Sequence, residues 1–226
     1  MVGVTVFVSS CDSYQAVWVP FCYGLRKYWP DCPWPIRFVT NYLDPPCGSS
    51  LKVGKDKDWT TTQRRALEQI STEVILFMLD DFWLIEPVDT KSLIEFAGLI
   101  IHKKVDKIHL TNFSDEKKTP SESKIDSRLN GYTRKSRYRT ALQASLWRVS
   151  TFLNLMRDGE APWDFETKGS VRSQDAPFVF LNVKEHHYIS YIKRPGACER
   201  GEWTEPAKKY AAKEGLQINF SMGPKQ

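Results

Sequence analysis

The sequence predicts an α/β domain in which helices flank a mostly parallel central sheet. Short apolar runs at residues 4–10, 36–40 and 74–79 contain β-branched side chains and are typical of strands buried on both faces. Stretches with helical spacing of apolar residues lie between these runs, and such alternation indicates a parallel sheet. At 226 residues the chain is long enough to enclose one sizeable core. No internal repeat or linker is visible, so residues 1–226 are expected to form a single domain.

The composition is that of an ordinary soluble chain, with 26% charged and 41% hydrophobic residues. The net charge of +5 suits an anionic ligand, but it is too small and too scattered to indicate nucleic-acid binding. Aromatic residues make up 13% of the chain and include eight tryptophans. Most of them are expected in the core, and some are expected to line a pocket for a flat or ring-shaped ligand.

The five cysteines form an odd set without a C-x-x-C pair: Cys11, Cys22, Cys32, Cys47 and Cys198. This pattern argues against a zinc knuckle and against the disulfide framework of a secreted domain, and it predicts a reducing, intracellular compartment. No signal peptide is visible before the first strand, and no apolar run reaches the ~18 residues of a membrane span. We therefore expect a cytoplasmic protein, with peripheral attachment to a membrane left open.

Small polar residues follow the first predicted strand, where a helix is expected to begin. Ser9, Ser10 and Asp12 lie in this turn, and residues 14–29 carry apolar side chains at helical spacing. Pro20 predicts either a kink in this helix or its true start. The turn would lie at the carboxyl end of the strand and near a helix N-terminus, which suits a ribose, a base or a phosphate. The alternative is that its polar side chains only cap the helix.

The next segment contains the predicted strand at residues 36–40. Residues 45–58, rich in proline, glycine, serine and lysine, are expected to form an exposed loop. A helix over residues 59–70, capped by a threonine near its start, would lead into the third strand. Arg64 in this helix could reach a phosphate, and the alternative is that it lies on a solvated surface.

Two adjacent carboxylates, Asp80 and Asp81, end the strand at residues 74–79, and apolar residues resume directly after them. Ionised carboxylates are costly among apolar neighbours unless they are paired, hydrogen-bonded or bound to a metal. At the end of a buried strand they would point into the crevice where open α/β sheets bind ligands. Their hard oxygen atoms suit Mg²⁺ or Mn²⁺, which take further ligands from water and substrate phosphates. The alternative is a solvated turn between two strands.

The second half of the chain predicts further helices and strands around one long loop. Helices are expected at residues 90–102, 150–156 and 173–181, and strands at 107–113, 141–149 and 186–194. Residues 114–139 are polar and basic, and they predict a long mobile loop of the kind that acts as a lid or a binding loop. Its charge would attract phosphates or an acidic acceptor, and a merely solvated loop is the alternative.

Residues 161–170 alternate acids with aromatics, because Asp164 and Glu166 stand beside Trp163 and Phe165. In an extended stretch the two carboxylates would share one face. Acids held against aromatic surface can have raised pKa values, which suits a catalytic general base. The alternative is a loop anchored by its aromatics, with its acids in water.

Basic residues near the C-terminus complete the candidate site. Arg194 and Arg200 belong to a glycine-containing stretch that could close over a diphosphate, and a tail follows from about residue 205. The neighbouring His186 and His187 could offer a metal ligand, although one of two adjacent strand histidines usually faces solvent.

Several of these segments together resemble the GT-A (Rossmann-like) fold of glycosyltransferases. They are SSCDSY (9–14), YWPDCPWPI (28–36), EVILFMLDDFWL (73–84), LQASLWRV (142–149) and APWDFE (161–166). More narrowly, the sequence is similar to the small nucleotide-sugar transferases of bacterial polysaccharide clusters and of chlorovirus glycan-building proteins. The similarity covers most of residues 3–205, and the Leu-Asp-Asp-Phe element is its most specific motif.

The resemblance implies a role for each candidate residue. Asp81 would bind Mn²⁺ or Mg²⁺ at the donor diphosphate, and Asp80 would contact the ribose or donor sugar beside that cation. Ser9 and Asp12 would hold the nucleotide base and ribose. Asp164 and Glu166 would lie on the acceptor side, where inverting members keep their catalytic base, and Asp164 is slightly favoured. A C-terminal histidine motif for a third metal ligand is not apparent in the sequence.

These observations predict a metal-dependent glycosyltransferase that moves a hexose or deoxyhexose from a nucleoside-diphosphate sugar to a hydroxyl of a glycan or glycoprotein. UDP is the commonest nucleotide in the resembled family, and a viral member would act in the host cytoplasm. No nucleic-acid partner and no transmembrane segment are expected. A metal-dependent phosphodiesterase or nucleotidyltransferase is one alternative, although such enzymes normally need more converging acids and a glycine-rich phosphate loop. A non-catalytic carbohydrate-binding module is another, which would explain the tryptophans but not the acid pair.

Overall fold

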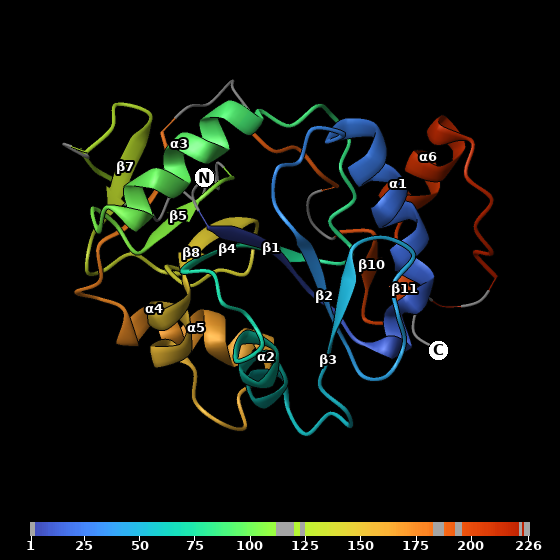
Figure 1. Ribbon diagram of the computed structural model, residues 1–226, viewed down its shortest axis with the longest axis horizontal. Helices are drawn as coiled ribbons and strands as arrows, with labels where there is room; N and C mark the ends of the chain where they lie inside the picture. The colour runs from blue at the N-terminus through green and yellow to red at the C-terminus, as the bar shows by residue number, and fades with distance from the viewer. Residues whose placement is uncertain are drawn as a thin grey trace.

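The computed structural model, which describes residues 3–111, 120–122, 125–182, 188–192, 196–221 and 223, contains a large sheet with helices on both faces (Figure 1). The helices are α1 (Trp18–Tyr28), α2 (Trp59–Leu67), α3 (Thr90–Ile101), α4 (Val149–Leu155), α5 (Pro162–Arg172) and α6 (Glu205–Glu214), and a 3-10 helix, η1 (Asp12–Val17), precedes α1. The strands are β1 (Val4–Ser9), β2 (Ile36–Thr40), β3 (Ser49–Lys52), β4 (Val74–Leu79), β5 (Lys107–His109), β6 (Pro120–Glu122), β7 (Leu129–Tyr132), β8 (Ser145–Arg148), β9 (Phe178–Leu181), β10 (Cys198–Glu199) and β11 (Glu202–Trp203).

The large sheet is parallel over one half and mixed over the other. Its strands lie in the order β3-β2-β1-β4-β8-β5-β9-β7-β6. The first four run parallel to one another, whereas β8 is antiparallel to both of its neighbours and β7 is antiparallel to β9. The α/β class and the flanking helices are confirmed. Parallel pairing is continuous from β3 to β4, and β5 and β9 form a further parallel pair beyond β8. A buried apolar run carries no information on strand direction, so the sequence did not show the change.

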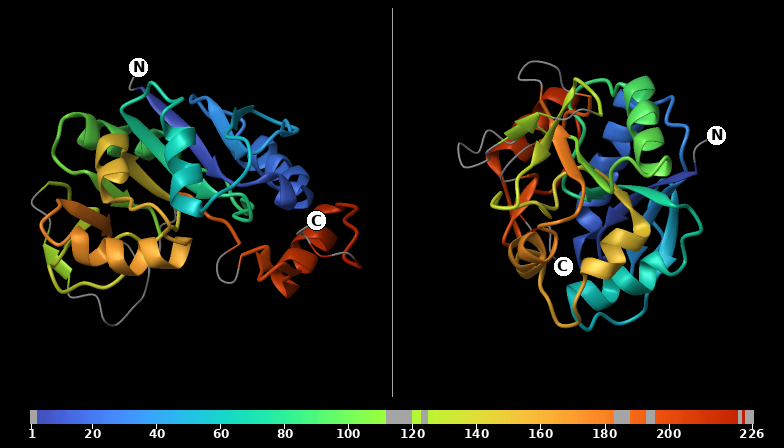
Figure 2. Two further views of the ribbon diagram at one scale, coloured as in Figure 1. Left: turned by 90° about the horizontal axis from the view of Figure 1, so that it is seen from below. Right: turned by 90° about the vertical axis from the view of Figure 1, so that its left-hand side faces the viewer.

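Alternate residues of the central strands enter two separate cores, one on each face of the sheet. Val6 and Leu76 belong to the core that also contains side chains of α1 and α3. Phe7 and Phe77 belong to the core formed with α2, α4 and α5. All four side chains are fully buried, and helices lie on both sides of the sheet (Figure 2). This confirms that β1 and β4 are buried on both faces, so their ends are held rigidly.

Several predicted elements differ from the structure in type. The expected loop at 45–58 contains β3, a short and partly exposed edge strand whose polar residues gave no strand signal. The described part of the expected loop at 114–139 contributes β6 and β7 to the opposite edge of the sheet. Residues 178–181 form β9 rather than the end of a helix, as their aromatic and β-branched composition favours. Of the expected strand at 186–194, residues 188–192 are described, and there Tyr191 forms an isolated antiparallel bridge with Leu84 instead of belonging to a longer strand.

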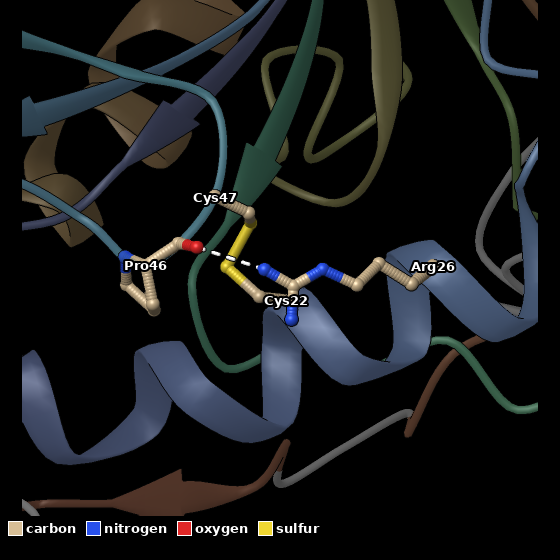
Figure 3. Close-up of a disulfide and its surroundings, with 4 residues drawn as sticks. All are labelled: Cys22, Arg26, Pro46 and Cys47. Atoms are coloured by element: carbon tan, nitrogen blue, oxygen red, sulfur yellow. Dashed lines mark hydrogen bonds between the residues drawn. A yellow bond between two sulfur atoms is a disulfide. The ribbon is translucent and has the colours of Figure 1, made fainter.

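A disulfide joins Cys22 of α1 to Cys47 in the connection between β2 and β3, across a sequence separation of 25 (Figure 3). Arg26, one turn further along α1, donates from Nη2 to the carbonyl oxygen of Pro46 at 2.8 Å, so the helix holds this connection at two adjacent points. The sequence argument against a disulfide framework gave no indication of this single bond, because an odd cysteine count can still include a pair. Since disulfides persist in oxidising environments, the predicted reducing compartment loses its basis.

The segment expected as a tail contains α6, which packs beside α1 (Figures 1 and 2). Glu214 of α6 accepts hydrogen bonds from Tyr23 Oη at 2.9 Å and Tyr28 Oη at 2.7 Å, and it pairs with Lys27. Burial disfavours the charge of Glu214, but these three donors outweigh burial and lower its pKa to about 2. Among the described residues, no helix is long and apolar enough to cross a membrane.

Candidate functional site

The carboxyl ends of β1 and β4 open into a cavity of about 450 Å³. The two strands are parallel neighbours with Ser9 opposite Leu79, so the residues that follow each strand lie side by side. The cavity is lined from these strand ends, from α2 and the connection before it, and from the C-terminal segment: Ser9, Ser10, Cys11, Tyr14, Asp56, Asp58, Trp59, Thr62, Gln63, Leu79, Asp80, Asp81, Pro162, Cys198 and Arg200. The crevice predicted at the strand ends is therefore present.

Asp80 is held by the turn that follows β1. Ser10 Oγ donates to Asp80 Oδ2 at 2.5 Å, and Trp18 Nε1 donates to the same Ser10 oxygen at 2.7 Å. The backbone amide of Asp80 donates to the carbonyl oxygen of Ser9 at 3.3 Å, which extends the strand pairing by one residue. Burial raises the pKa of Asp80 far above its ordinary value, and the hydrogen bond from Ser10 offsets only part of this effect.

Asp81 has fewer partners than Asp80. Its Oδ1 atom is buried and has no hydrogen-bond partner among the described residues. Burial raises the pKa of Asp81, and the neighbouring charge of Asp80 raises it further. Asp80 and Asp81 are only 8% and 9% exposed, so the alternative of a solvated turn is wrong. Two buried carboxylates, one with a free oxygen, favour the presence of a cation.

The C-terminal segment closes over Asp81. The amide of Ala197 donates to the carbonyl oxygen of Asp81 at 3.1 Å, and Gly196 lies against the carboxylate itself. Gly196 has a φ of +88°, and a β-carbon at this position would collide with Asp81 Oδ2. Thr204 Oγ1 donates to the carbonyl oxygen of Gly196 at 2.7 Å and fixes the segment from its other side. A glycine is therefore required beside the acid pair.

The donor set of this cavity fits a hard divalent cation. No group of three or more His, Cys, Asp or Glu side chains converges on one point within the described residues. Mg²⁺ and Mn²⁺ commonly use one or two protein carboxylates and complete their coordination with water and substrate phosphates. Asp80 and Asp81, with the unpartnered Oδ1 of Asp81, meet that requirement.

Helix α2 supplies the opposite wall of the cavity. Asp58 caps this helix by accepting from the Thr61 amide at 2.8 Å, and burial of its carboxylate is outweighed by such hydrogen bonds, so its pKa is lowered to about 2. The expected cap, Thr60 or Thr61, was two or three positions too late. Trp59 and Gln63 face the cavity from the first two turns. Gln63 is 1% exposed, and its Oε1 has no hydrogen-bond partner among the described residues.

Five of the predicted site residues meet in this cavity, namely Ser9, Ser10, Asp80, Asp81 and Arg200. Arg194 lies outside the described residues, as do His186 and His187. The remaining four predicted residues, Asp12, Arg64, Asp164 and Glu166, are not among those that line it.

Asp12 and Arg64 have structural partners elsewhere. Asp12 accepts from the amides of Asn41, Tyr42 and Leu43 at 2.8–3.1 Å, so it fixes the loop after β2 instead of capping a helix. Arg64 faces away from the cavity, where it lies 3.6 Å from Asp158. On a helix, adjacent residues point in different directions, and the cavity position belongs to Gln63.

Asp164 and Glu166 lie on α5, so the predicted extended stretch is wrong. Two residues apart on a helix, their side chains do not share a face. Asp164 accepts from the amide of Ala161 at 3.3 Å and pairs with Lys168 at 2.8 Å, and these contacts lower its pKa rather than raise it. Glu166 Oε1 accepts from the amide of Leu142 at 2.7 Å. A role as catalytic base stays a prediction for these two residues.

The cavity also contains residues that the sequence reasoning missed. Asp56, Asp58 and Trp59 were assigned to a loop or to the start of a helix, although an aspartate before Trp-Thr-Thr-Thr is a recognisable helix cap. Gln63 had no signal of its own beyond its position next to Arg64. Cys198 lines the cavity, and Gly196 lies beside Asp81. The sequence around them has no helical or strand periodicity, and Gly196 itself was the only sign that the backbone approaches another group closely.

No protein-family model matches the sequence, and a search of curated proteins found no match. Among solved structures, the chain is similar to S. aureus TarS 1–349, with 14% identity and a TM-score of 0.50 over 83% of this chain and 60% of that one. It is also similar to a cytidylyltransferase from Leptospira borgpetersenii, with 11% identity and a TM-score of 0.51 over 82% of this chain and 78% of that one. The chain thus spans about 60% of the length of TarS 1–349. At these identities the comparisons show the fold alone, and that fold is the GT-A-like, single α/β arrangement that the sequence resemblance implied.

Proposed function

We propose that the chain is a metal-dependent glycosyltransferase that uses a nucleoside-diphosphate sugar, first of all a UDP-sugar, as donor. The sugar, a hexose or deoxyhexose, would be transferred to a hydroxyl of a glycan or glycoprotein. The observation that carries this proposal is the buried Asp80–Asp81 pair at the end of β4, which lies in a cavity and has one carboxylate oxygen without a hydrogen-bond partner in the part of the chain that the structure describes.

The cation would be Mn²⁺ or Mg²⁺, held by Asp81 together with Asp80, and it would neutralise the charge of the leaving diphosphate. Ser10 supports this arrangement because its hydrogen bond fixes the orientation of Asp80. Arg200, at the edge of the cavity, carries a positive charge that can share the stabilisation of the diphosphate.

The reaction exchanges one bond at the anomeric carbon of the sugar. The acceptor oxygen forms a bond to that carbon while the bond from the carbon to the diphosphate oxygen breaks. The diphosphate leaves with the electron pair, and the proton of the acceptor hydroxyl passes to a base. A volume of about 450 Å³ lies within the ~300–1,000 Å³ range of pockets for ligands of this size. Tyr14 and Trp59 give the cavity aromatic walls for a base or sugar ring.

A metal-dependent nucleotidyltransferase is the second candidate. The likeness to a cytidylyltransferase favours it, since that protein shares the same fold. Against it, the sequence contains no glycine-rich phosphate loop, and the described residues contain no larger cluster of metal-binding side chains. A carbohydrate-binding module has no need for two buried acids, so the geometry favours it least.

Incubation with UDP-, GDP- and TDP-sugars, each with and without Mn²⁺, tests the proposal. Release of free nucleoside diphosphate and sugar, dependent on Mn²⁺ and selective for one nucleotide, is the expected result, since glycosyltransferases hydrolyse their donors slowly when no acceptor is present. Release of pyrophosphate from a nucleoside triphosphate mixed with a sugar phosphate would instead establish the nucleotidyltransferase. Binding of sugars alone, without nucleotide or metal, would establish the binding module.

A further inference from the structure

A second cavity, of about 270 Å³, lies between α5 and the loop that follows β7. It is lined by Arg134, Lys135, Ser136, Arg137, Tyr138, Thr167, Ser170, Val171 and Gln174. None of the individual residues predicted for donor binding, metal binding or catalysis lines this cavity, although five of its lining residues belong to the basic stretch 114–139 that was expected to attract phosphates or an acidic acceptor.

The lining of the second cavity is basic. It contains three cationic side chains and no acid. Arg134 pairs with Asp175 at 3.1 Å, but both side chains are largely exposed, and such surface pairs contribute little. Lys135 and Arg137 are exposed and have no ion pair within the described part of the chain. Within the described residues, two cationic side chains without an ion pair, beside a cavity lining that contains no acid, favour an anionic ligand.

Buried hydrogen bonds hold this loop in place, so its side chains are presented from a fixed backbone. Arg139 is 1% exposed, and its guanidinium donates to the carbonyl oxygens of Thr133 at 2.9 Å, Ser173 at 2.7 Å and Ala176 at 2.8 Å. Lys107 donates to the carbonyl oxygen of Arg139 at 2.8 Å. A ligand that binds here has little loop-ordering entropy to overcome.

An exposed aromatic residue connects this cavity with the candidate active site. Trp163 is 65% exposed, unusual for a residue that is otherwise mostly buried in proteins. Its ring meets that of Tyr138, which lines the second cavity, at 6.4 Å between centroids and 73° between planes. Pro162, its neighbour in the chain, lines the first cavity. The apolar face of a pyranose ring can pack against such an exposed indole.

We propose that the second cavity and Trp163 bind an acidic glycan, with a carboxylate-bearing sugar at Lys135 and Arg137 and a following sugar ring on Trp163. That this glycan is the acceptor of the transfer rests on the proposed function. In that case the chain of sugars would run from Trp163 past Pro162 to the donor cavity. A volume of about 270 Å³ accommodates one or two sugar rings, whereas single-stranded nucleic acid needs several stacking platforms along an extended groove.

Calorimetry with hexagalacturonate, maltohexaose and an oligouridylate tests the proposal. Wild-type protein should bind hexagalacturonate, with an affinity that falls as salt is added, and should bind the other two more weakly. The double variant Lys135→Gln/Arg137→Gln should bind hexagalacturonate roughly tenfold more weakly, since two charge-assisted contacts are lost. Trp163→Ala should also weaken binding while its melting temperature stays unchanged, because the side chain is exposed. The control is Lys208→Gln/Lys209→Gln, which removes two exposed lysines of α6, one of them paired with Glu205, and which should bind like wild type.

Three results would overturn the glycan site: equal affinity for hexagalacturonate and maltohexaose, unchanged affinity in the Lys135→Gln/Arg137→Gln variant, or tighter binding of the oligouridylate. Asp81→Asn separates this inference from the proposed function, because it should leave hexagalacturonate binding intact. If the wild type shows the expected glycan pattern but no Mn²⁺-dependent binding of UDP, the glycan site stands and the transferase assignment fails. If the wild type binds UDP in an Mn²⁺-dependent way but Lys135→Gln/Arg137→Gln binds hexagalacturonate as tightly as the wild type does, the glycan site is wrong and the proposed transferase function stands.

Discussion

Gly196 leaves the space that the Asp81 carboxylate occupies, since a β-carbon at this glycine would collide with Asp81 Oδ2. The contact joins the end of β4 to a segment more than one hundred residues later in the chain. The C-terminal segment is therefore part of the acid site, and its backbone determines how the second carboxylate is placed.

Gly196→Ala should disable the site through this contact. The variant combines a left-handed backbone, which costs about 1–2 kcal/mol for alanine, with displacement of Asp81. We expect lower stability by urea unfolding and loss of Mn²⁺-dependent UDP binding. Gly159→Ala is the matched control, because Gly159 has a φ of +82° with nothing near its β-carbon position. If both variants bind UDP equally well, Gly196 does not position Asp81.

Gln63→Ala and Arg64→Ala compare two neighbouring positions on α2. Gln63 lines the cavity, and its Oε1 has no hydrogen-bond partner within the described ranges, whereas Arg64 does not line the cavity and lies near Asp158. A lost hydrogen bond of about 1 kcal/mol should weaken UDP binding roughly fivefold in Gln63→Ala. Arg64→Ala should bind UDP as the wild type does. The reverse order of affinities would restore Arg64 as the donor-binding residue.

The contribution of Glu214 to stability should depend on pH. Its pKa is lowered from 4.5 to about 2 in the folded protein, so folding favours its charged form. The stabilisation is then complete above about pH 4.5 and is lost as the pH falls toward 2. Urea unfolding of wild type and Glu214→Gln should show a clear difference at pH 7 that shrinks over this interval. A difference that is constant with pH would mean that the charge of Glu214 is not what joins α6 to α1.

Reduction of the Cys22–Cys47 disulfide should destabilise the protein without affecting the acid pair directly. A closed loop with a separation of 25 residues gives about 3.5 kcal/mol of stabilisation on chain-entropy grounds. The melting temperature should fall on addition of dithiothreitol. The Cys22→Ser/Cys47→Ser variant should already melt at the lower temperature and should not respond to the reductant. An equal response of that variant would assign the effect to another cysteine.

The parts of the site that the sequence predicted are those with strong local signals. Asp80 and Asp81 interrupt a run of apolar residues, and the cost of burying two acids there was enough to indicate a ligand. Ser9 and Ser10 were found because polar residues follow a buried strand. The positions of Asp12 and Arg64 depended on the direction of one side chain in a turn or helix, which spacing alone does not determine.

Long-range features of the fold had no local signal. The antiparallel insertion of β8 between β4 and β5 had no local signal, because the side chains of a buried strand are compatible with either strand direction. The Cys22–Cys47 bond depends on tertiary proximity, and Gly196 meets Asp81 only after the chain has passed through the whole sheet. Asp164 and Glu166 were misplaced because an alternating pattern over four residues also occurs in the first turn of a helix, here one that begins at Pro162.

Calorimetric titration of UDP into wild-type protein and Asp81→Asn, each with and without Mn²⁺, tests the central claim most directly. The wild type should bind UDP tightly only when Mn²⁺ is present, and Asp81→Asn should lose this metal dependence while its circular dichroism and unfolding transition show a folded protein. Equal UDP affinity with and without Mn²⁺ in the wild type, or an unchanged metal effect in Asp81→Asn, would contradict the assignment of the acid pair as the metal site.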